Sequence, residues 1–230
     1  MCEIVAVHWR SRRPFGELLP WAEKVEHYGL GSFGWGVAWL DGGRVGCHRF
    51  PGRMKEDPYV QAGLLEVRST HFLVHFRRPN KLSTVQLADT QPFRDAAHMF
   101  VFCHNGSFAR EPEFRPRYVS RLHGKADSEV GFRMLEDLLA EGRAPADAVS
   151  ELHKLLGGRA NIGYLSSRGD LLVFNAYPQN RMWRFRSGEA EVAATELHSS
   201  DDSLFDLVFP EATDRRQVAG VEAVTVGVGR

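Results

Sequence analysis

Two adjacent helical segments in the middle of the chain separate two groups of predicted strands. Residues 127–142 (DSEVGFRMLEDLLAEG) carry apolar side chains at helical spacing, with Asp127 or Ser128 to cap the start and Gly142 to end the helix. Residues 144–158 (APADAVSELHKLLGG) predict a second helix that also ends at glycine. The order of strands, a helix pair and strands again favours an α+β fold with layered, largely antiparallel sheets over a βαβ winding.

The segments on either side of the helix pair are rich in β-branched and aromatic residues, which are typical of strands. Residues 34–50 predict a hairpin that turns at Asp41-Gly42-Gly43. Helical spacing occurs at residues 58–67 and at 16–29, where we expect Pro20 to kink the helix. The remaining predicted strands are residues 2–8, 70–77, 98–106, 161–167, 170–176, 182–187, 190–197 and 221–228.

The composition of the 230-residue chain limits its partners and its compartment. With 29 basic and 29 acidic residues, no net charge attracts nucleic acid or an anionic membrane, and we interpret the clusters at 10–14 and 77–78 as solvated surface. Three cysteines without a CxxC pair, no signal peptide and no apolar run of about 18–20 residues predict a cytoplasmic protein without a membrane span. The length fits one domain, which we place at residues 1–230.

Cys2 directly follows the initiator methionine and opens an apolar run, MCEIVAV. Methionine is normally removed before a small residue. Its removal would give Cys2 a free α-amine, whose pKa of about 7.7–8.0 allows it to act as base for its own thiol. Cys2 could equally be a buried apolar residue at the start of a strand. Position alone leaves both interpretations open.

Three short motifs contain candidate partners for such a nucleophile. In FCHNGSF, a strand ends at Asn105-Gly106, whose side-chain amide and backbone N–H could form an oxyanion hole, although Asn-Gly is also a common hairpin turn. In HFRRPN, Arg77 follows a strand and could hold a carboxylate in a bidentate contact, or be an ordinary surface arginine. In KADSEVGF, Asp127 could bind an ammonium group or cap the helix.

In combination and order, these motifs resemble the class II glutamine amidotransferases, which are N-terminal-nucleophile hydrolases. The resemblance covers nearly the whole chain and includes the blocks FGWGVAWL, NIGYLSSRGDLLVFNA and AATEL. The short motifs that match in order are Met1-Cys2, HFR at 75–77, DTQPF at 89–93, HNGSF at 104–108 and ADSE at 126–129. The resemblance implies a four-layered αββα sandwich with two mainly antiparallel sheets.

The resemblance also implies roles for individual residues. Cys2, exposed once residue 1 is removed, matches the nucleophile, and Asn105 with Gly106 matches the oxyanion hole. Arg77 matches the arginine that holds the α-carboxylate of a glutamyl group, and Asp127 matches the acid that receives its α-ammonium. The implied reaction is acyl transfer. The thiol attacks the γ-carbonyl of glutamine or of a small γ-glutamyl amide, an amine leaves, and water hydrolyses the thioester.

His75 and His104 end predicted strands beside these residues, and we assign His104 to the substrate-binding set with Arg77 and Asp127. The ten histidines are otherwise scattered, with no HExxH motif or paired-cysteine spacing. A zinc site needs three or four converging ligands, so we expect no metal and no cofactor.

The chain departs from the family pattern in loops expected beside the glutamyl pocket. Family members commonly carry Asn-Thr-His-Pro-Phe where this chain has Asp89-Thr90-Gln91-Pro92-Phe93, and a threonine where it has Asn80. Both Gln91 and Asn80 can still donate and accept hydrogen bonds. We therefore expect activity, with a substrate preference that need not be for free glutamine.

Three functions stay open at this point. We favour a free-standing amidohydrolase for a small γ-glutamyl metabolite, because the chain ends near the expected end of the family's domain. The alternatives are a glutaminase subunit that delivers ammonia to a separate synthase and a silent γ-glutamyl-binding module. A synthase or a second copy in a homodimer is the macromolecular partner that these alternatives allow.

Overall fold

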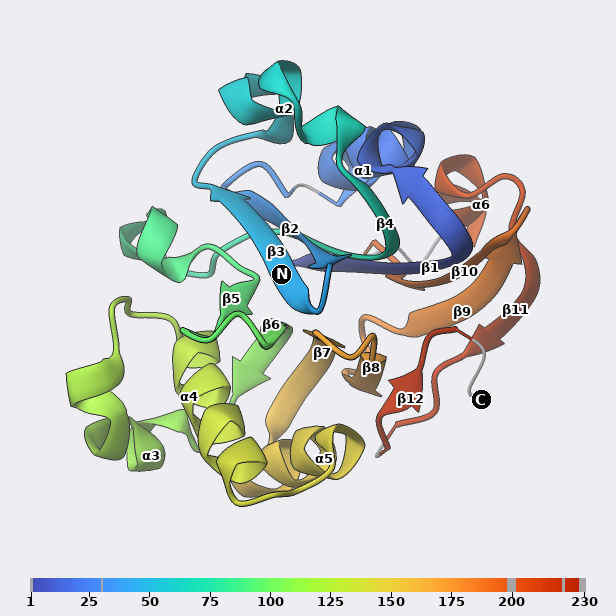
Figure 1. The fold of residues 1–230 in the computed structure, drawn as a ribbon. Helices are drawn as coiled ribbons and strands as arrows, with labels where there is room; N and C mark the ends of the chain where they lie inside the picture. Colours follow the sequence, from blue (N-terminus) through green and yellow to red (C-terminus); the bar gives the residue numbers. More distant parts are fainter. Residues whose placement is uncertain (1, 30, 198–201, 221, 228–230) are drawn as a thin grey trace.

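Two β-sheets stack face to face at the centre of the computed structural model, and helices cover the outer face of each sheet (Figure 1). The structure describes residues 2–29, 31–197, 202–220 and 222–227. All the strand pairs within the two sheets are antiparallel. The predicted α+β fold with two mainly antiparallel sheets is therefore confirmed.

The first sheet has seven strands, and three helices lie outside it (Figure 1). These elements are β1 (Glu3–Pro14), β2 (Trp35–Asp41), β3 (Arg44–Phe50), β4 (Arg68–Phe76), β9 (Met182–Ser187), β10 (Ala190–Thr195), β11 (Thr213–Gln217), α1 (Leu19–Tyr28), α2 (Pro58–Ala62) and α6 (Asp202–Val208). The strand order is β11-β9-β10-β1-β4-β2-β3, so the strand that follows Cys2 is at the centre of the sheet.

The second sheet has five strands in the order β12-β8-β7-β6-β5; α4 and α5 cover it, and α3 packs against α4 (Figure 1). These elements are β5 (Phe93–Arg94), β6 (Phe100–Phe108), β7 (Gly158–Ser166), β8 (Leu171–Ala176), β12 (Val224–Thr225), α3 (Glu111–Tyr118), α4 (Asp127–Ala140) and α5 (Pro145–Leu156). Strand β12 lies within the strand predicted at 221–228, whose end residues 221 and 228 are outside the described residues.

Alternating side chains on β1 show how the sequence builds both faces of the first sheet. Val5 and Val7 pack into the core beneath the outer helices, whereas Ile4 and Ala6 pack between the two sheets. Successive residues of a strand point to opposite faces, and a strand buried on both faces is apolar throughout. The register of this central strand therefore fixes the position of Cys2, the residue before it.

The predicted helix pair forms α4 and α5, and both helices pack on the second sheet through a shared apolar core. The start of α4 differs from the prediction in one respect. Its N-cap position is Ala126, and no side chain caps it, so Asp127 and Ser128 do not have the predicted capping role. Both side chains instead contact β6, Asp127 at the Phe108 N–H and Ser128 at the His104 ring.

Three local predictions are wrong for identifiable reasons. Pro20 lies in the first turn of α1, where its missing N–H is tolerated, so it starts the helix instead of kinking it. The segment 58–67 is not one continuous helix: α2 ends at Ala62, Gly63 interrupts it with a φ of 162°, and a short 3-10 helix follows at Leu64–Glu66. Asn105-Gly106 forms no turn, because both residues lie inside β6 and pair with β7.

The sequence patterns missed α3, α6 and β11, which are short or rich in charged residues. Within the described residues, no helix combines the length and the apolar character that crossing a membrane requires.

Candidate active site

A cavity of about 370 Å³ lies where the start of β1, the end of β4, strand β6 and the first turn of α4 come together. These four segments are far apart in the sequence. The cavity brings together all six residues that the sequence predicted for the site, namely Cys2, Arg77, His104, Asn105, Gly106 and Asp127. Their roles in catalysis and binding stay predictions.

Cys2 lies in the cavity wall beside the chain that follows β4. The Arg78 N–H points to Cys2 Sγ at 3.4 Å. Burial raises the pKa of the Cys2 thiol, and the hydrogen bond from Arg78 acts in the opposite direction. A thiol with a raised pKa is mostly protonated at neutral pH, so it needs a base before it can act as a nucleophile. Met1, whose removal the sequence predicts, is outside the described residues.

Asn105 on β6 contacts Cys2 through its side-chain oxygen. The Cys2 nitrogen donates to Asn105 Oδ1 at 2.8 Å. Because that nitrogen is a donor, the amide must present its oxygen there and point Nδ2 away. Nδ2 is buried and has no hydrogen-bond partner within the described residues. Asn105 thus keeps one buried N–H donor available beside the thiol.

Gly106 follows Asn105 in the cavity wall and has a φ of 144°. A side chain at this position would overlap the carbonyl oxygen of Arg159 on the neighbouring strand β7. Only glycine combines this backbone conformation with such a close approach.

A row of buried asparagines continues from Asn105 across the second sheet. Asn161 on β7 lies opposite Asn105, and Asn175 on β8 lies opposite Asn161. Asn175 donates to Asn161 Oδ1, and Asn161 donates to the carbonyl of Asn180 at 2.8 Å. This row extends the polar environment behind the cavity. Sequence analysis missed it, because only strand register places these residues side by side.

Arg77 presents a guanidinium group that is only partly satisfied. The residue is 4% exposed, and its Nη2 donates to Thr84 Oγ1 at 2.6 Å. Nη1 is buried and has no partner within the described residues. Burial lowers the pKa of Arg77, but arginine remains charged in proteins. The free Nη1 is therefore a cationic donor that suits a carboxylate.

Asp127, in the first turn of α4, brings a negative charge to the same cavity. Its Oδ2 accepts a hydrogen bond from the Phe108 N–H and its Oδ1 from the Ser128 N–H, both at 2.9 Å. Among the described residues, it forms no ion pair with a lysine or arginine. An ammonium group could therefore bind here without displacing a cation of the protein.

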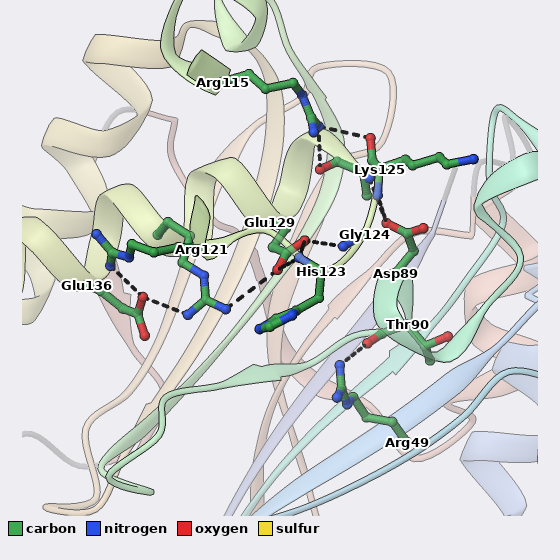
Figure 2. Close-up of polar contacts among 12 residues, drawn as sticks. Arg49, Asp89, Thr90, Arg115, Arg121, His123, Gly124, Lys125, Glu129 and Glu136 are labelled. Carbon is green, nitrogen blue, oxygen red and sulfur yellow. Dashed lines mark hydrogen bonds and ion pairs between the residues drawn. The ribbon is translucent and has the colours of Figure 1, made fainter. Parts of the chain in front are cut away.

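Asp89 fixes the backbone immediately before Asp127 (Figure 2). This buried carboxylate accepts hydrogen bonds from the Lys125 and Ala126 N–H groups, both at 2.7 Å. Its other oxygen accepts from Gln86 Nε2 at 2.7 Å. The sequence identified Asp89 only as a departure from the family pattern. The structure gives it a positioning role for the loop that leads to Asp127.

Two further charged residues bind other backbone groups of this loop (Figure 2). Glu129 accepts hydrogen bonds from the His123 and Gly124 N–H groups, at 2.9 and 2.7 Å. Arg115 donates to the carbonyl groups of Lys125 and Ala126, at 2.9 and 3.1 Å. We call residues 123–126 the clamped loop. Its backbone is held from three sides, so little freedom is left in the position of Asp127.

Gln91 binds β6 through both atoms of its side-chain amide. Its Oε1 accepts from the His104 N–H at 2.6 Å, and its Nε2 donates to the His104 carbonyl at 3.1 Å. The Gln91 side chain thus binds the β6 backbone in the way that the backbone of a neighbouring strand would. Gln91 therefore still donates and accepts hydrogen bonds where the family pattern has histidine, and both of its polar atoms are used inside the protein.

The His104 ring lies between β6 and α4. Its Nδ1 is 2.9 Å from Ser128 Oγ, and the ring stacks on Phe108 with the ring centroids 3.9 Å apart. Burial lowers the pKa of His104. Because Ser128 occupies one ring nitrogen, these contacts suit a residue that positions the start of α4. Direct contact of His104 with a substrate stays a prediction.

Curated relatives of this chain are larger proteins. The chain is 25% identical over 166 residues to glutamine–fructose-6-phosphate aminotransferase (isomerizing) of Staphylococcus epidermidis. The match covers 69% of this chain and 26% of that protein. The chain therefore spans about a quarter of the length of the curated relatives that it matches.

Solved structures share the fold. The glutamine phosphoribosylpyrophosphate amidotransferase of B. subtilis matches with a TM-score of 0.71 and 18% identity, over 95% of this chain and 46% of that one. A glutamine aminotransferase class-II domain protein of Silicibacter pomeroyi matches with a TM-score of 0.59 and 19% identity, over 85% and 88%. A predicted glutamine amidotransferase of Pseudomonas aeruginosa matches with a TM-score of 0.56 and 16% identity, over 98% and 97%.

The family model described as glutamine amidotransferases class-II matches residues 1–221. This match covers every described helix and every described strand except β12, which begins at Val224, together with every residue of the cavity. The chain belongs to the class II glutamine amidotransferases.

Proposed function

We propose that this protein hydrolyses the amide bond of a small γ-glutamyl amide, or of glutamine, through a thioester on Cys2. The main support is a pair of opposite charges in one cavity: within the described residues, Arg77 Nη1 has no hydrogen-bond partner and Asp127 forms no ion pair. The amino-acid end of a glutamyl group carries a carboxylate and an ammonium. Two fixed opposite charges would bind both and hold the γ-carbonyl near the thiol.

In the proposed reaction, removal of Met1 converts the Cys2 nitrogen into an α-amine. This amine takes the thiol proton, and Sγ attacks the γ-carbonyl carbon. Asn105 Nδ2 and the Gly106 N–H stabilise the oxyanion. The carbon–nitrogen bond then breaks, and the leaving amine receives the proton from the α-ammonium of Cys2. Water attacks the thioester, which releases glutamate and restores the thiol.

The contact between Cys2 and Asn105 supports this arrangement. Asn105 Oδ1 lies 2.8 Å from the nitrogen that would become the α-amine. The same side chain would thus orient the base through Oδ1 and the oxyanion through Nδ2. One side-chain amide would thus hold the base and the oxyanion in a fixed position relative to each other, which favours the reaction.

A second candidate function is a glutaminase that supplies ammonia to a separate synthase. The curated relatives favour it, because they are named as aminotransferases that use glutamine, and this chain matches about a quarter of their length. Both functions use the same site chemistry. They differ in whether the protein turns over without a partner.

The test is the intact mass of the purified protein before and after incubation with a diazoketone analogue of glutamine. We expect loss of the Met1 mass and one covalent adduct, which is absent from Cys2→Ala. Cys47→Ala is the matched control and should keep the adduct, because burial raises the pKa of Cys47 to about 11. A retained methionine without an adduct would contradict the catalytic proposal and favour a binding module.

Turnover of the isolated protein then separates the two enzymatic candidates. Steady hydrolysis of γ-glutamyl amides without a partner would support the amidohydrolase. A protein that forms the adduct but releases product only when a synthase is added would support the glutaminase subunit.

A further inference from the structure

The outer part of the cavity carries an excess of positive charge that the glutamyl group would not use. The cavity wall contains four basic residues, namely Arg77, Arg78, Lys81 and Lys125, and two acidic residues, Glu111 and Asp127. The whole chain, by contrast, has equal numbers of acidic and basic residues. The proposed function uses Arg77 and Asp127, one of each sign. The charges that remain in the wall are mainly positive.

Glu111 does not offset this excess. Its carboxylate forms an ion pair with Arg115, which is not part of the cavity wall. Within the described residues, the side-chain nitrogens of Lys81 and Lys125 form no ion pair and no hydrogen bond. These two lysines are therefore available to a bound molecule.

Both lysines have a fixed backbone, which distinguishes them from ordinary surface lysines. The Lys81 carbonyl accepts a hydrogen bond from Thr84 Oγ1 at 2.7 Å, and the same hydroxyl receives the hydrogen bond from Arg77. Lys125 belongs to the clamped loop, two residues before Asp127. Each lysine is thus connected to one of the two residues that would hold the amino-acid end.

Figure 2 shows the Lys125 side chain extending away from the part of its backbone that Asp89 and Arg115 bind. The bound backbone anchors the residue at the cavity wall, and the flexible side chain leaves the ammonium free to meet a ligand. A lysine ammonium is a compact point charge that binds carboxylates without the fixed fork geometry of arginine.

We infer that this outer region is a subsite for the leaving amine, and that the preferred substrate is a γ-glutamyl amide whose amine carries a carboxylate, such as a γ-glutamyl amino acid. The inference rests on the proposed function, because it assumes that the glutamyl group binds between Arg77 and Asp127. Ammonia, the leaving group of glutamine, has no charge that would use this subsite. A substrate with an acidic amine would use both lysines.

The test compares two substrates that differ only in the charge of the amine, γ-glutamyl-β-alanine and γ-glutamyl-β-alaninamide. We expect kcat/KM to be about tenfold higher for the acid, because its carboxylate gains two partly exposed ion pairs, each of which is weak. The difference should shrink in 1 M salt, which screens exposed charges. The Lys81→Gln/Lys125→Gln variant should lower the ratio to about one, because kcat/KM for the acid falls.

Lys154→Gln is the matched control, because this exposed lysine lies on α5, outside the cavity. It should keep the tenfold ratio. A second measurement needs no turnover, namely the concentration of each compound that halves the rate of diazoketone labelling at Cys2. Equal protection and equal kcat/KM in the native protein would overturn the subsite, while labelling would still support the proposed function. Loss of labelling altogether would overturn the proposed function and the subsite with it.

Discussion

The two sides of the cavity are stabilised in opposite ways. On the β4 side, buried polar atoms lack partners within the described residues, both ring nitrogens of His75 and Nη1 of Arg77. On the α4 side, Asp89, Glu129 and Arg115 bind the backbone of the clamped loop from three directions. The β4 side contains buried polar groups without hydrogen-bond partners. The α4 side contains a loop whose backbone is held by hydrogen bonds.

Because of this difference, we expect changes on the two sides to affect activity and stability to different extents. A buried polar group without a partner lowers stability by about 1–3 kcal/mol, but it is ready to bind a ligand. A loop held by several charge-assisted hydrogen bonds is stable, and it keeps one carboxylate in place. Changes on the β4 side should therefore reduce activity more than stability. Changes on the α4 side should reduce both.

The largest expected effect is on the β4 side, from Arg77→Gln. We expect kcat/KM for a γ-glutamyl amide to fall roughly 100- to 1,000-fold, because a charged partner of the substrate carboxylate is lost. The free energy of unfolding should stay within about 1 kcal/mol of the native value, since the change also removes an unsatisfied buried donor. Steady-state kinetics and urea unfolding of the same preparation measure both quantities.

Arg77→Lys sharpens this test, because lysine keeps the charge and loses the fork geometry. A variant that recovers only part of the activity would indicate bidentate binding. An Arg77→Gln protein that loses stability as strongly as activity would contradict the contrast between the two sides.

On the α4 side, Asp89→Ala should destabilise the protein by about 3 kcal/mol, because it leaves the Lys125 and Ala126 N–H groups without their acceptor. Activity should fall with it, as Asp127 loses its fixed position. Asp89→Asn is the matched control, since its Oδ1 can accept from both N–H groups. Urea unfolding should place Asp89→Asn within about 1 kcal/mol of the native protein. Equal losses in both variants would show that the negative charge matters more than the hydrogen bonds.

Arg77 and Asp89 also show which parts of the site the sequence alone can predict. Arg77 was predicted, because it stands in a short motif at the end of a strand and its role depends on the residue type. The β2–β3 hairpin and the α4–α5 pair were predicted for a similar reason, since their turn residues and apolar periodicity are local. Local patterns indicate the α+β fold class, and the resemblance to the family, carried by short motifs in order, points to the six residues around the cavity.

The clamped loop could not be predicted, because its contacts join distant residues. Asp89 binds a backbone N–H 37 residues later, and nothing in the residues around Asp89 indicates that partner. The contact of Glu129 could have been predicted from its position in the sequence. An acidic residue in the first turn of a helix often reaches back to free backbone N–H groups, as in a capping box. Here it reaches His123 and Gly124, beyond the N-cap.

A pH dependence of stability should arise on the β4 side from His75. Burial, with Arg77 and His104 nearby, lowers the pKa of His75 to about 3, far below the usual value near 6.5. Below pH 6.5 the unfolded chain takes up a proton that the folded protein excludes, so stability is full above this pH and falls as the pH drops toward 3. The expected slope is about 1.4 kcal/mol per pH unit.

The measurement is urea unfolding at pH 7, 6 and 5 for the native protein and for His75→Leu. Other titrating groups contribute to both proteins, so the difference between the two curves isolates His75. The variant should lose less stability on acidification than the native protein. Parallel curves would show that His75 has a partner or is solvated, and would weaken the description of the β4 side as unsatisfied.

The smallest expected effect comes from Thr84→Val, which removes the hydrogen bond that Arg77 Nη2 donates to the Thr84 hydroxyl. Valine keeps the shape of threonine and leaves the Arg77 Nη2 without its acceptor. We expect KM for a γ-glutamyl amide to rise about fivefold with little change in kcat, since a hydrogen bond of this kind contributes about 1 kcal/mol. Thr84→Ser keeps the hydroxyl and should restore KM. If Thr84→Val changes kcat and not KM, the hydroxyl acts on the reacting geometry, and Arg77 is held in place by its burial alone.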